Sequence, residues 1–227
     1  MNKIIDINDV LTYPEELINL FNNDNDTILD EIFMNYSFKC SHVTCTYDIN
    51  NYYKSGIMRS FKIFKNGDWE INQELKNIIL KPISNLSNYV EYADKYDKIL
   101  LKEYEENKNL DNNWYGKYSC VCYSLDDISK INSDNPCYEL LIKCHGGEIF
   151  RDLGLSDVDA EKIASNYKAY VISFKLSYEE IKKGILMEDL IKHMKLMYKI
   201  GKSDYEFEGS INKDISPNDF IEIIEVN

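Results

Sequence analysis

The stretch AYVISFKL at residues 169–176 decides the fold class, because it is the clearest β-strand pattern in the chain. Tyr, Val, Ile and Phe dominate it, and these residue types are enriched in strands. Two further apolar runs lie upstream, at residues 117–123 and 137–144, and the tail supplies two more strand patterns. Helical patterns come earlier in the chain and strand patterns later. This order predicts an α+β fold rather than a regular alternation of strand and helix.

The first third of the chain has mainly helical spacing. Apolar side chains recur at helical intervals in residues 14–22 and again in residues 26–33, so both segments are expected to be helices. The period changes to that of a strand at residues 37–44. A third helix is expected at residues 48–55, and Gly56 is expected to end it.

A polar, charge-rich region separates this early strand from the later ones. Two or three helices are expected between residues 61 and 113, and residues 87–107 form the clearest of them. Another amphipathic helix is expected at residues 186–200. Because no repeat or linker marks a boundary, we expect one domain. Its expected parts are an N-terminal helical part at residues 1–36 and a core at residues 37–227, with a helical insertion at about residues 66–112.

The composition narrows the classes of partner and compartment. A formal net charge of −13 argues against generic DNA or RNA binding, because backbone binding needs clustered Lys and Arg. The sequence shows no targeting signal and no apolar stretch of the roughly 20 residues that a membrane helix needs. We therefore expect a cytoplasmic protein without a membrane partner. Its 6 cysteines are expected to be buried thiols, because their spacing fits no zinc finger and no secretory signal favours disulfides.

The tail sequence YEFEGSI at residues 205–211 places two carboxylates two residues apart. If the segment is a strand, Glu206 and Glu208 point to one face of it and Phe207 points to the other. Such a pair can hold a ribose hydroxyl and stabilise a sugar cation. It is also typical of an ordinary solvent-exposed strand face. The choice depends on which other side chains lie nearby.

Two upstream strands carry side chains that could complete a nucleotide site. His42 and Thr44 share a face of the strand at residues 37–44, and together they could bind the ribose and amide groups of a nucleotide. A histidine inside the core is the commoner alternative. Tyr123 and Ser124 end the next strand, where the ring could stack on a flat ligand and the hydroxyl could bind an amide. With 18 tyrosines in the chain, a core or surface role is the default alternative.

The last motif that could bind a ligand is HGGE at residues 145–148. Paired glycines let a backbone approach a ligand closely, or they form a tight turn. The motif has neither a Walker nor a Rossmann context, so a simple loop or hairpin explains it at least as well.

Taken in order, these motifs resemble the ADP-ribosyltransferases of the His-Tyr-Glu type. The resemblance covers about residues 38–226 and rests on the His-x-Thr strand, the helix ending in Ser-Gly-Ile, the Tyr-Ser strand, the Glu-x-Glu strand and the sequence ISPNDFI at residues 215–221. It implies a split, mostly antiparallel β-sheet that encloses an NAD pocket. It also implies cleavage of the nicotinamide–ribose bond and transfer of ADP-ribose to an unknown protein or nucleic-acid acceptor, or to water.

The resemblance implies a role for each residue that binds the cofactor. His42 would hydrogen-bond the adenosine-side or the nicotinamide-side ribose of NAD, with Thr44 supporting it. Tyr123 would stack on the nicotinamide ring, with Ser124 nearby. Tyr118 is the alternative stacking residue, because the register of this strand is open.

The resemblance also implies catalytic carboxylates. Glu208 would hold the 2′-hydroxyl of the nicotinamide ribose and stabilise the oxocarbenium-like transition state. Glu206 would orient or deprotonate the accepting group. Glu148 is a further pocket residue or the alternative main acid, since the pattern assigns it no fixed place.

Two other classes of function compete with a transferase. The first is a non-catalytic interaction protein, such as an immunity factor or a phage-type inhibitor, whose acidity masks a basic partner surface. The second is a nuclease or other metal enzyme that uses His145 and Glu148. No ordered set of metal ligands supports the second class, so it ranks last.

Overall fold

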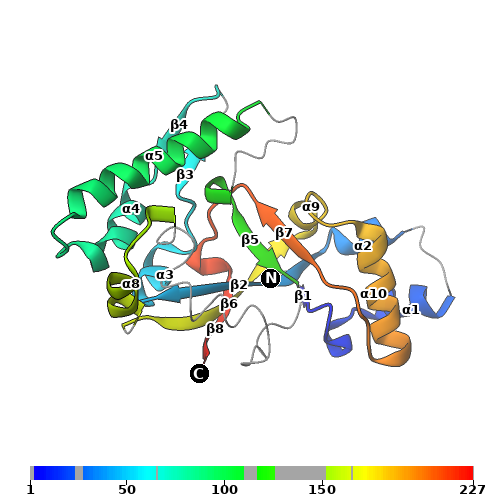
Figure 1. Cartoon of the computed structure of the whole chain (residues 1–227). Helices are drawn as coiled ribbons and strands as arrows, with labels where there is room; N and C mark the ends of the chain where they lie inside the picture. Colours follow the sequence, from blue (N-terminus) through cyan, green and yellow to red (C-terminus); the bar gives the residue numbers. More distant parts are fainter. Residues whose placement is uncertain are drawn as a thin grey trace.

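The computed structural model describes residues 3–23, 28–64, 66–109, 117–125, 152–164 and 166–226. These residues form an α+β fold around a mostly antiparallel sheet of 6 strands, in the order β7-β5-β2-β6-β8 with β1 beside β2 (Figure 1). The strands are β1 (Lys3–Ile5), β2 (Tyr36–Thr46), β5 (Val121–Ser124), β6 (Lys168–Ser177), β7 (Glu208–Ile211) and β8 (Phe220–Val226). The α+β prediction is confirmed.

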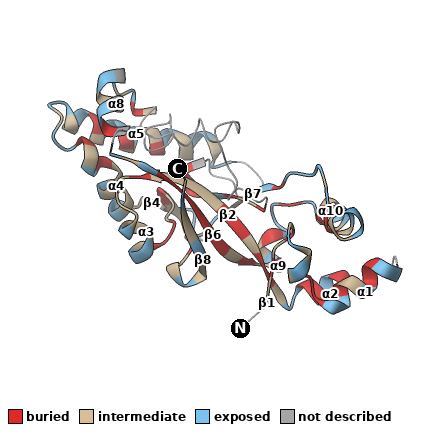
Figure 2. Cartoon of the chain, turned by 90° about the horizontal axis from the view of Figure 1, so that it is seen from below, coloured by how far each residue is buried: buried red, intermediate tan, exposed pale blue. Residues whose placement is uncertain are grey.

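The centre of the sheet is the antiparallel pair β2 and β6. Their register runs from Ser37 opposite Ser177 to Thr46 opposite Lys168. Phe38 and Phe174 on these strands are fully buried, because their side chains point to the face that the helices cover. Figure 2 shows buried residues following both strands. The strands predicted around residues 37–44 and 169–176 are therefore confirmed.

A group of helices covers one end of this sheet, as Figure 1 shows. Rings from three elements meet there: Phe33 lies 5.4 Å from Phe38 and 5.5 Å from Tyr178 between ring centroids. Rings at such spacings stabilise a core beyond the area that they bury. The helices are α1 (Glu15–Asn23), α2 (Leu29–Phe33), α9 (Tyr178–Ile181) and α10 (Met187–Ile200). Those predicted at residues 14–22 and 186–200 are confirmed, and the one predicted at residues 26–33 is confirmed from Leu29 onward, since residues 26 and 27 lie outside the described residues. We call this sheet and its helices the body.

A second set of elements has a hydrophobic core of its own, and we call it the lobe. It comprises β3 (Phe61–Ile63), β4 (Trp69–Ile71), α4 (Gln73–Leu80), η2 (Lys81–Ile83), α5 (Tyr89–Asn107), η3 (Lys117–Ser119) and α8 (Asp157–Ala164). Its buried cluster includes Phe61, Tyr96 and Leu100, together with Leu153 and Ile163 from much later in the chain. The helix predicted at residues 87–107 is confirmed. The core of the lobe takes in Phe61 and these later residues as well as residues of the insertion expected at 66–112.

Three short elements differ from the prediction. Lys3–Ile5 forms β1, parallel to β2, inside the N-terminal part at residues 1–36 that was expected to be helical. The hairpin of β3 and β4 lies in the polar region between residues 61 and 113, where two or three helices were expected and no strand was predicted. Strands of 3 residues are too short to show an alternating pattern, so their apolar positions did not stand out.

The strand predicted at residues 117–123 and the strand predicted in the tail both begin later than expected. Lys117–Ser119 is a 3-10 helix, and β5 starts at Val121. In the tail, β7 starts at Glu208, so Glu206 precedes the strand. The apolar run at residues 137–144 lies outside the described residues.

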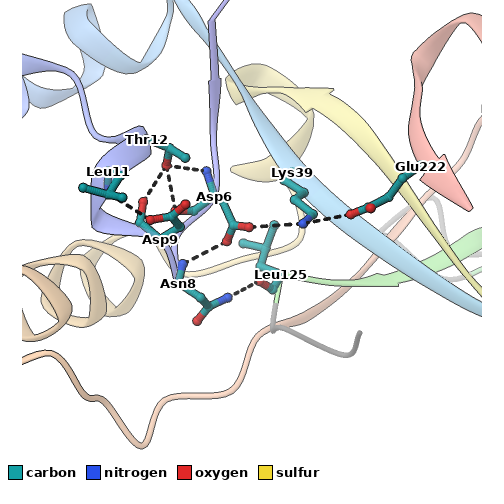
Figure 3. Close-up of polar contacts among 8 residues, drawn as sticks. All are labelled: Asp6, Asn8, Asp9, Leu11, Thr12, Lys39, Leu125 and Glu222. Atoms are coloured by element: carbon teal, nitrogen blue, oxygen red, sulfur yellow. Dashed lines mark hydrogen bonds and ion pairs between the residues drawn. The ribbon is translucent and has the colours of Figure 1, made fainter. Parts of the chain in front are cut away.

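The N-terminal segment is bound to three parts of the sheet (Figure 3). Lys39 on β2 lies 3.3 Å from carboxylate oxygens of both Asp6 and Glu222, so it joins β1, β2 and β8. The amide of Asn8 donates to the carbonyl of Leu125 at 2.8 Å, where β5 ends. The Thr12 hydroxyl oxygen lies 3.0 Å from the carbonyl oxygen of Asp6 and 2.7 Å from that of Asp9, at the adjoining 3-10 turn, η1 (Val10–Thr12).

The chain passes from the body to the lobe directly after α3 (Asn50–Ser55), which ends at Gly56 as predicted. Gly56 has φ +78°, and a Cβ there would lie 1.9 Å from the carbonyl oxygen of Ile215. Ile57 and Ile215 form a two-way backbone bridge, followed by the 3-10 helix η5 (Pro217–Asp219). Arg59 then binds Asp214 through its backbone and its guanidinium. These hydrogen bonds hold the segment after α3 against the segment before η5. We call this contact the joint between body and lobe.

Within the described residues, no helix has the length and apolar character needed to cross a membrane. No disulfide joins the four described cysteines. Cys40 and Cys120 are buried as predicted, whereas Cys122 is exposed, because its side chain leaves β5 on the side away from Val121 and Tyr123.

Candidate functional site

Strands β2 and β5 diverge directly after their one register pair, Ser41 opposite Ser124. The side chain of His42 crosses the resulting gap, and its Nδ1 lies 2.9 Å from the carbonyl oxygen of Cys122. A carbonyl oxygen can only accept a hydrogen bond, so Nδ1 carries a proton and donates it. The imidazole of His42 therefore joins β2 to β5 through a hydrogen bond from a side chain to a backbone carbonyl.

A cavity of about 260 Å³ opens beside this gap, between the body and the lobe. One wall is polar and comes from β2 and α3, including His42, Thr44 and Tyr52. Another part of the lining is apolar and includes Leu75 and Ile78 of α4. Among the described residues that line the cavity, none is Asp, Glu, Lys or Arg. The cavity therefore suits an amphipathic group that carries no phosphate.

The protonation state of His42 follows from its surroundings. Burial lowers the pKa of His42, and the hydrogen bond to Cys122 opposes that shift without cancelling it. The ring is therefore neutral at pH 7, with its proton on Nδ1. In a neutral imidazole the other nitrogen, Nε2, is an acceptor. His42 can accordingly accept a hydrogen bond from a ligand hydroxyl or amide.

The neighbouring hydroxyls form a second polar contact in the cavity. Thr44 Oγ1 and the Tyr52 hydroxyl oxygen are 2.7 Å apart. Burial raises the pKa of Tyr52, so it stays a neutral phenol. Each hydroxyl can use its remaining capacity to bind a ligand. His42 and Thr44, which the sequence placed on one strand face, therefore line the same cavity.

The acid predicted from the tail lies on the other face of the sheet. Glu208 pairs with Ser124, and Ser124 pairs with Ser41, so these three side chains share one face. His42 follows Ser41 on β2 and points to the opposite face. Glu206 and Glu208 are both exposed. Among the described residues, the structure does not bring either carboxylate to the cavity.

The predicted stacking residue is part of the body core. Tyr123 is 3% exposed and covers Gly209 of β7, where a Cβ would lie 2.6 Å from its ring. It does not line the cavity, and neither does Ser124. The alternative residue, Tyr118, is buried in the lobe and hydrogen-bonded to Asp152. Glu148 lies outside the described residues.

The sequence did not single out the aromatic residues that do line the cavity. They are Tyr47, Tyr52 and Tyr167, contributed by the segment after β2, by α3 and by the residue before β6. With 18 tyrosines in the chain, none of them carries a signal of its own. The apolar wall had a detectable signal, because Leu75, Ile78 and Ile79 recur at helical spacing.

Comparison with known proteins adds no relative: no family model, no curated protein and no solved structure matches this chain. The geometry of the cavity is therefore the basis for a functional proposal.

Proposed function

We propose that the chain is an ADP-ribosyltransferase-like protein whose cavity holds the nicotinamide–ribose part of NAD. The observation that carries this proposal is the hydrogen bond from His42 Nδ1 to the Cys122 carbonyl. It fixes the imidazole between β2 and β5 and leaves Nε2 as an acceptor on a residue that lines the cavity. A ribose hydroxyl is a suitable donor to that atom, and Thr44 with Tyr52 supplies further hydroxyls beside it.

The size and charge of the cavity agree with binding of one half of the dinucleotide. Pockets for drug-sized ligands enclose about 300–1,000 Å³. A cavity of about 260 Å³ suits a nucleoside-sized group better than a whole dinucleotide. Since the described lining contains no Lys or Arg, the diphosphate of NAD lies outside it in this proposal. The split-sheet transferase fold is part of the same proposal.

Transfer of ADP-ribose also needs a carboxylate beside the ribose. This catalytic part of the proposal is tested separately from NAD binding. Glu208 lies across the sheet from His42, and Glu206 is exposed before β7. Glu208 remains the first candidate acid and Glu148 the second. The test of each is its replacement by Gln, with nicotinamide release as the measure of activity.

Binding is tested first, by thermal shift and calorimetry with NAD up to millimolar concentrations. We expect NAD to raise the melting temperature and His42→Ala to weaken binding at least tenfold, because the variant lacks the acceptor. Tyr53→Phe is the matched control, since Tyr53 lies beside Tyr52 on α3 and is 57% exposed. Lack of NAD binding by the wild-type chain would refute the proposal.

The second candidate function is an acidic interaction protein that covers a basic partner surface. Exposed Glu206 and Glu208 at the β7 edge of the sheet, with the net charge of −13, favour it. In that case Glu206→Lys with Glu208→Lys abolishes a salt-sensitive complex and leaves the cavity unaffected.

A further inference from the structure

The strand β8 has a partner on one side only. It forms one end of the sheet beside β6, and the C-terminus of the chain follows it (Figure 1). Within the described residues, β6 is the only strand that pairs with β8, and residues 221–226 make no backbone hydrogen bond to a loop. Successive residues of a strand direct their N–H and C=O groups to alternate sides. The outer side of β8 therefore presents a row of unpaired backbone donors and acceptors.

This edge is regular enough to receive another strand. Consecutive register pairs with β6 run from Ser173 opposite Glu222 to Ala169 opposite Val226, beyond a register shift that leaves Ile221 without an opposite residue. The sequence of β8 contains neither Lys nor Pro, which commonly block pairing at an edge strand. Apolar side chains occupy most of its other positions. Two carboxylates are thus the features that decide which strand can pair here.

The carboxylates give the edge a negative charge on both faces. The side chains of Glu222 and Glu225 are 41% and 39% exposed, and they point to opposite faces because they are three residues apart. Glu222 lies 3.3 Å from Lys39, and Glu225 lies 2.7 Å from Lys168. Lys39 also contacts Asp6, so that group of two acids and one lysine keeps a net negative charge. A carboxylate accepts several hydrogen bonds, so both glutamates can bind a further cation.

The same charges disfavour a second copy of this chain as the added strand. The antiparallel register that overlaps residues 221–226 of two copies places Glu222 of one copy opposite Glu225 of the other. Like charges directly opposite each other destabilise a strand pair. Each copy also has a formal net charge of −13, so the two copies repel each other. A basic strand from another protein is attracted by both the local and the overall charge.

We propose that β8 binds an extended, basic segment of a partner protein, which adds a strand to the outer edge of the sheet. Backbone hydrogen bonds supply affinity. Two Lys or Arg residues of the segment, three positions apart and therefore one on each face, pair with Glu222 and Glu225. The inference goes beyond the proposed function and does not depend on it, because none of the described residues that line the cavity belongs to β8.

The test uses the full chain and the capped peptide Ac-TVKVVKVT-NH2, in which the lysines are three positions apart. We expect binding in calorimetry at low salt, with slower amide hydrogen exchange in residues 221–226. Glu222→Gln and Glu225→Gln should each weaken binding about threefold, and together about tenfold, through loss of the cross-strand ion pairs. The matched control is Glu105→Gln with Glu106→Gln, which removes two exposed acids of α5 and should leave the affinity unchanged.

Two comparison peptides separate strand pairing from simple charge attraction. Ac-TVQVVQVT-NH2 lacks the charges, and the lysine peptide N-methylated at both central valines cannot form the backbone pairs on either of its edges. Weaker binding of both, with slowed exchange in residues 221–226, supports the inference. Equal binding of either one overturns it, as does a lysine peptide that fails to bind. Dimerisation of the wild-type chain with protected β8 amides also overturns it, since the edge then has an occupant. The peptide comparisons leave the protein unaltered, so a misfolded variant cannot imitate their result.

Discussion

The body and the lobe build their cores in different ways. The body depends on long strands whose partners are far apart in sequence, as in the pairing of Ser37 with Ser177. The lobe depends largely on one helix, α5, which buries Tyr92, Tyr96 and Leu100 along a single face. Local contacts of this kind form readily, whereas strand pairs must first close long loops. The cavity lies where the two meet, so its geometry depends on both cores and on the joint between them.

The joint provides the largest expected effect. Gly56→Ala forces a side chain into a backbone with φ +78° and places its Cβ 1.9 Å from the Ile215 carbonyl oxygen. Strain and overpacking together should lower the free energy of unfolding by about 3–5 kcal/mol, measured by urea denaturation. Gly67→Ala is the control, because Gly67 has φ +85° but no atom within 4 Å of the new Cβ. Its expected cost is about 1 kcal/mol. Equal losses of unfolding free energy in the two variants would show that the backbone around Ile215 shifts to make room for the new Cβ.

A matched pair of core substitutions tests whether the two cores unfold separately. Leu100 in the lobe and Leu176 in the body are 0% and 1% exposed. Each change to Ala should cost about 3 kcal/mol, through lost burial and a residual cavity. Leu176→Ala should lower hydrogen-exchange protection throughout the described sheet. Leu100→Ala should raise exchange mainly in α4 and α5, because Leu100 belongs to the core of the lobe and not to that of the body.

If Leu100→Ala lowers protection equally in β2 and β6, the body and the lobe form one cooperative unit. The body and the lobe would then differ in how their cores are built and not in how they unfold. Ligand affinity is a second readout, since α4 forms the apolar wall of the cavity. We expect Leu100→Ala to weaken ligand binding even where the body stays protected.

The same contrast explains which parts of the fold could be predicted from sequence. Long elements with a clear period, such as β6 and α5, were predicted to within a few residues. Elements of 3 residues, such as β1 and β3, show no period, although Asn66-Gly67 is a recognised hairpin signal. Pairing between distant strands is set by tertiary packing, which a single sequence does not display.

The candidate site shows the same difference between spacing within one strand, which the sequence reveals, and pairing between strands, which it does not. Spacing within β2 was enough to place His42 and Thr44 on one face, and both line the cavity. Whether Glu208 shares that face depends on its pairing with Ser124, which joins β7 to β5. The sequence of neither strand alone predicts that pairing. The sequence therefore predicted one wall of the site and could not predict how the tail is placed relative to it.

The smallest expected effect concerns the pH dependence of His42, which lines the cavity between body and lobe. Burial lowers its pKa in the folded chain, while the unfolded chain titrates near the ordinary value of about 6.5. Below about pH 6.5 the unfolded chain therefore takes up a proton that the folded chain does not. Its contribution to stability is present above that pH and is lost as the pH falls toward the folded pKa.

His42→Gln removes this titration and retains hydrogen-bonding groups across the gap. The stability of the wild type relative to this variant should fall by about 1 kcal/mol or less between pH 7 and pH 5, measured by urea denaturation at both values. Ligand affinity should fall over the same range, because a protonated Nε2 donates and no longer accepts. A constant difference in stability would mean that the imidazole titrates as it does in water. The imidazole would then be open to solvent, and His42 would be a poor acceptor for a ligand hydroxyl in the cavity.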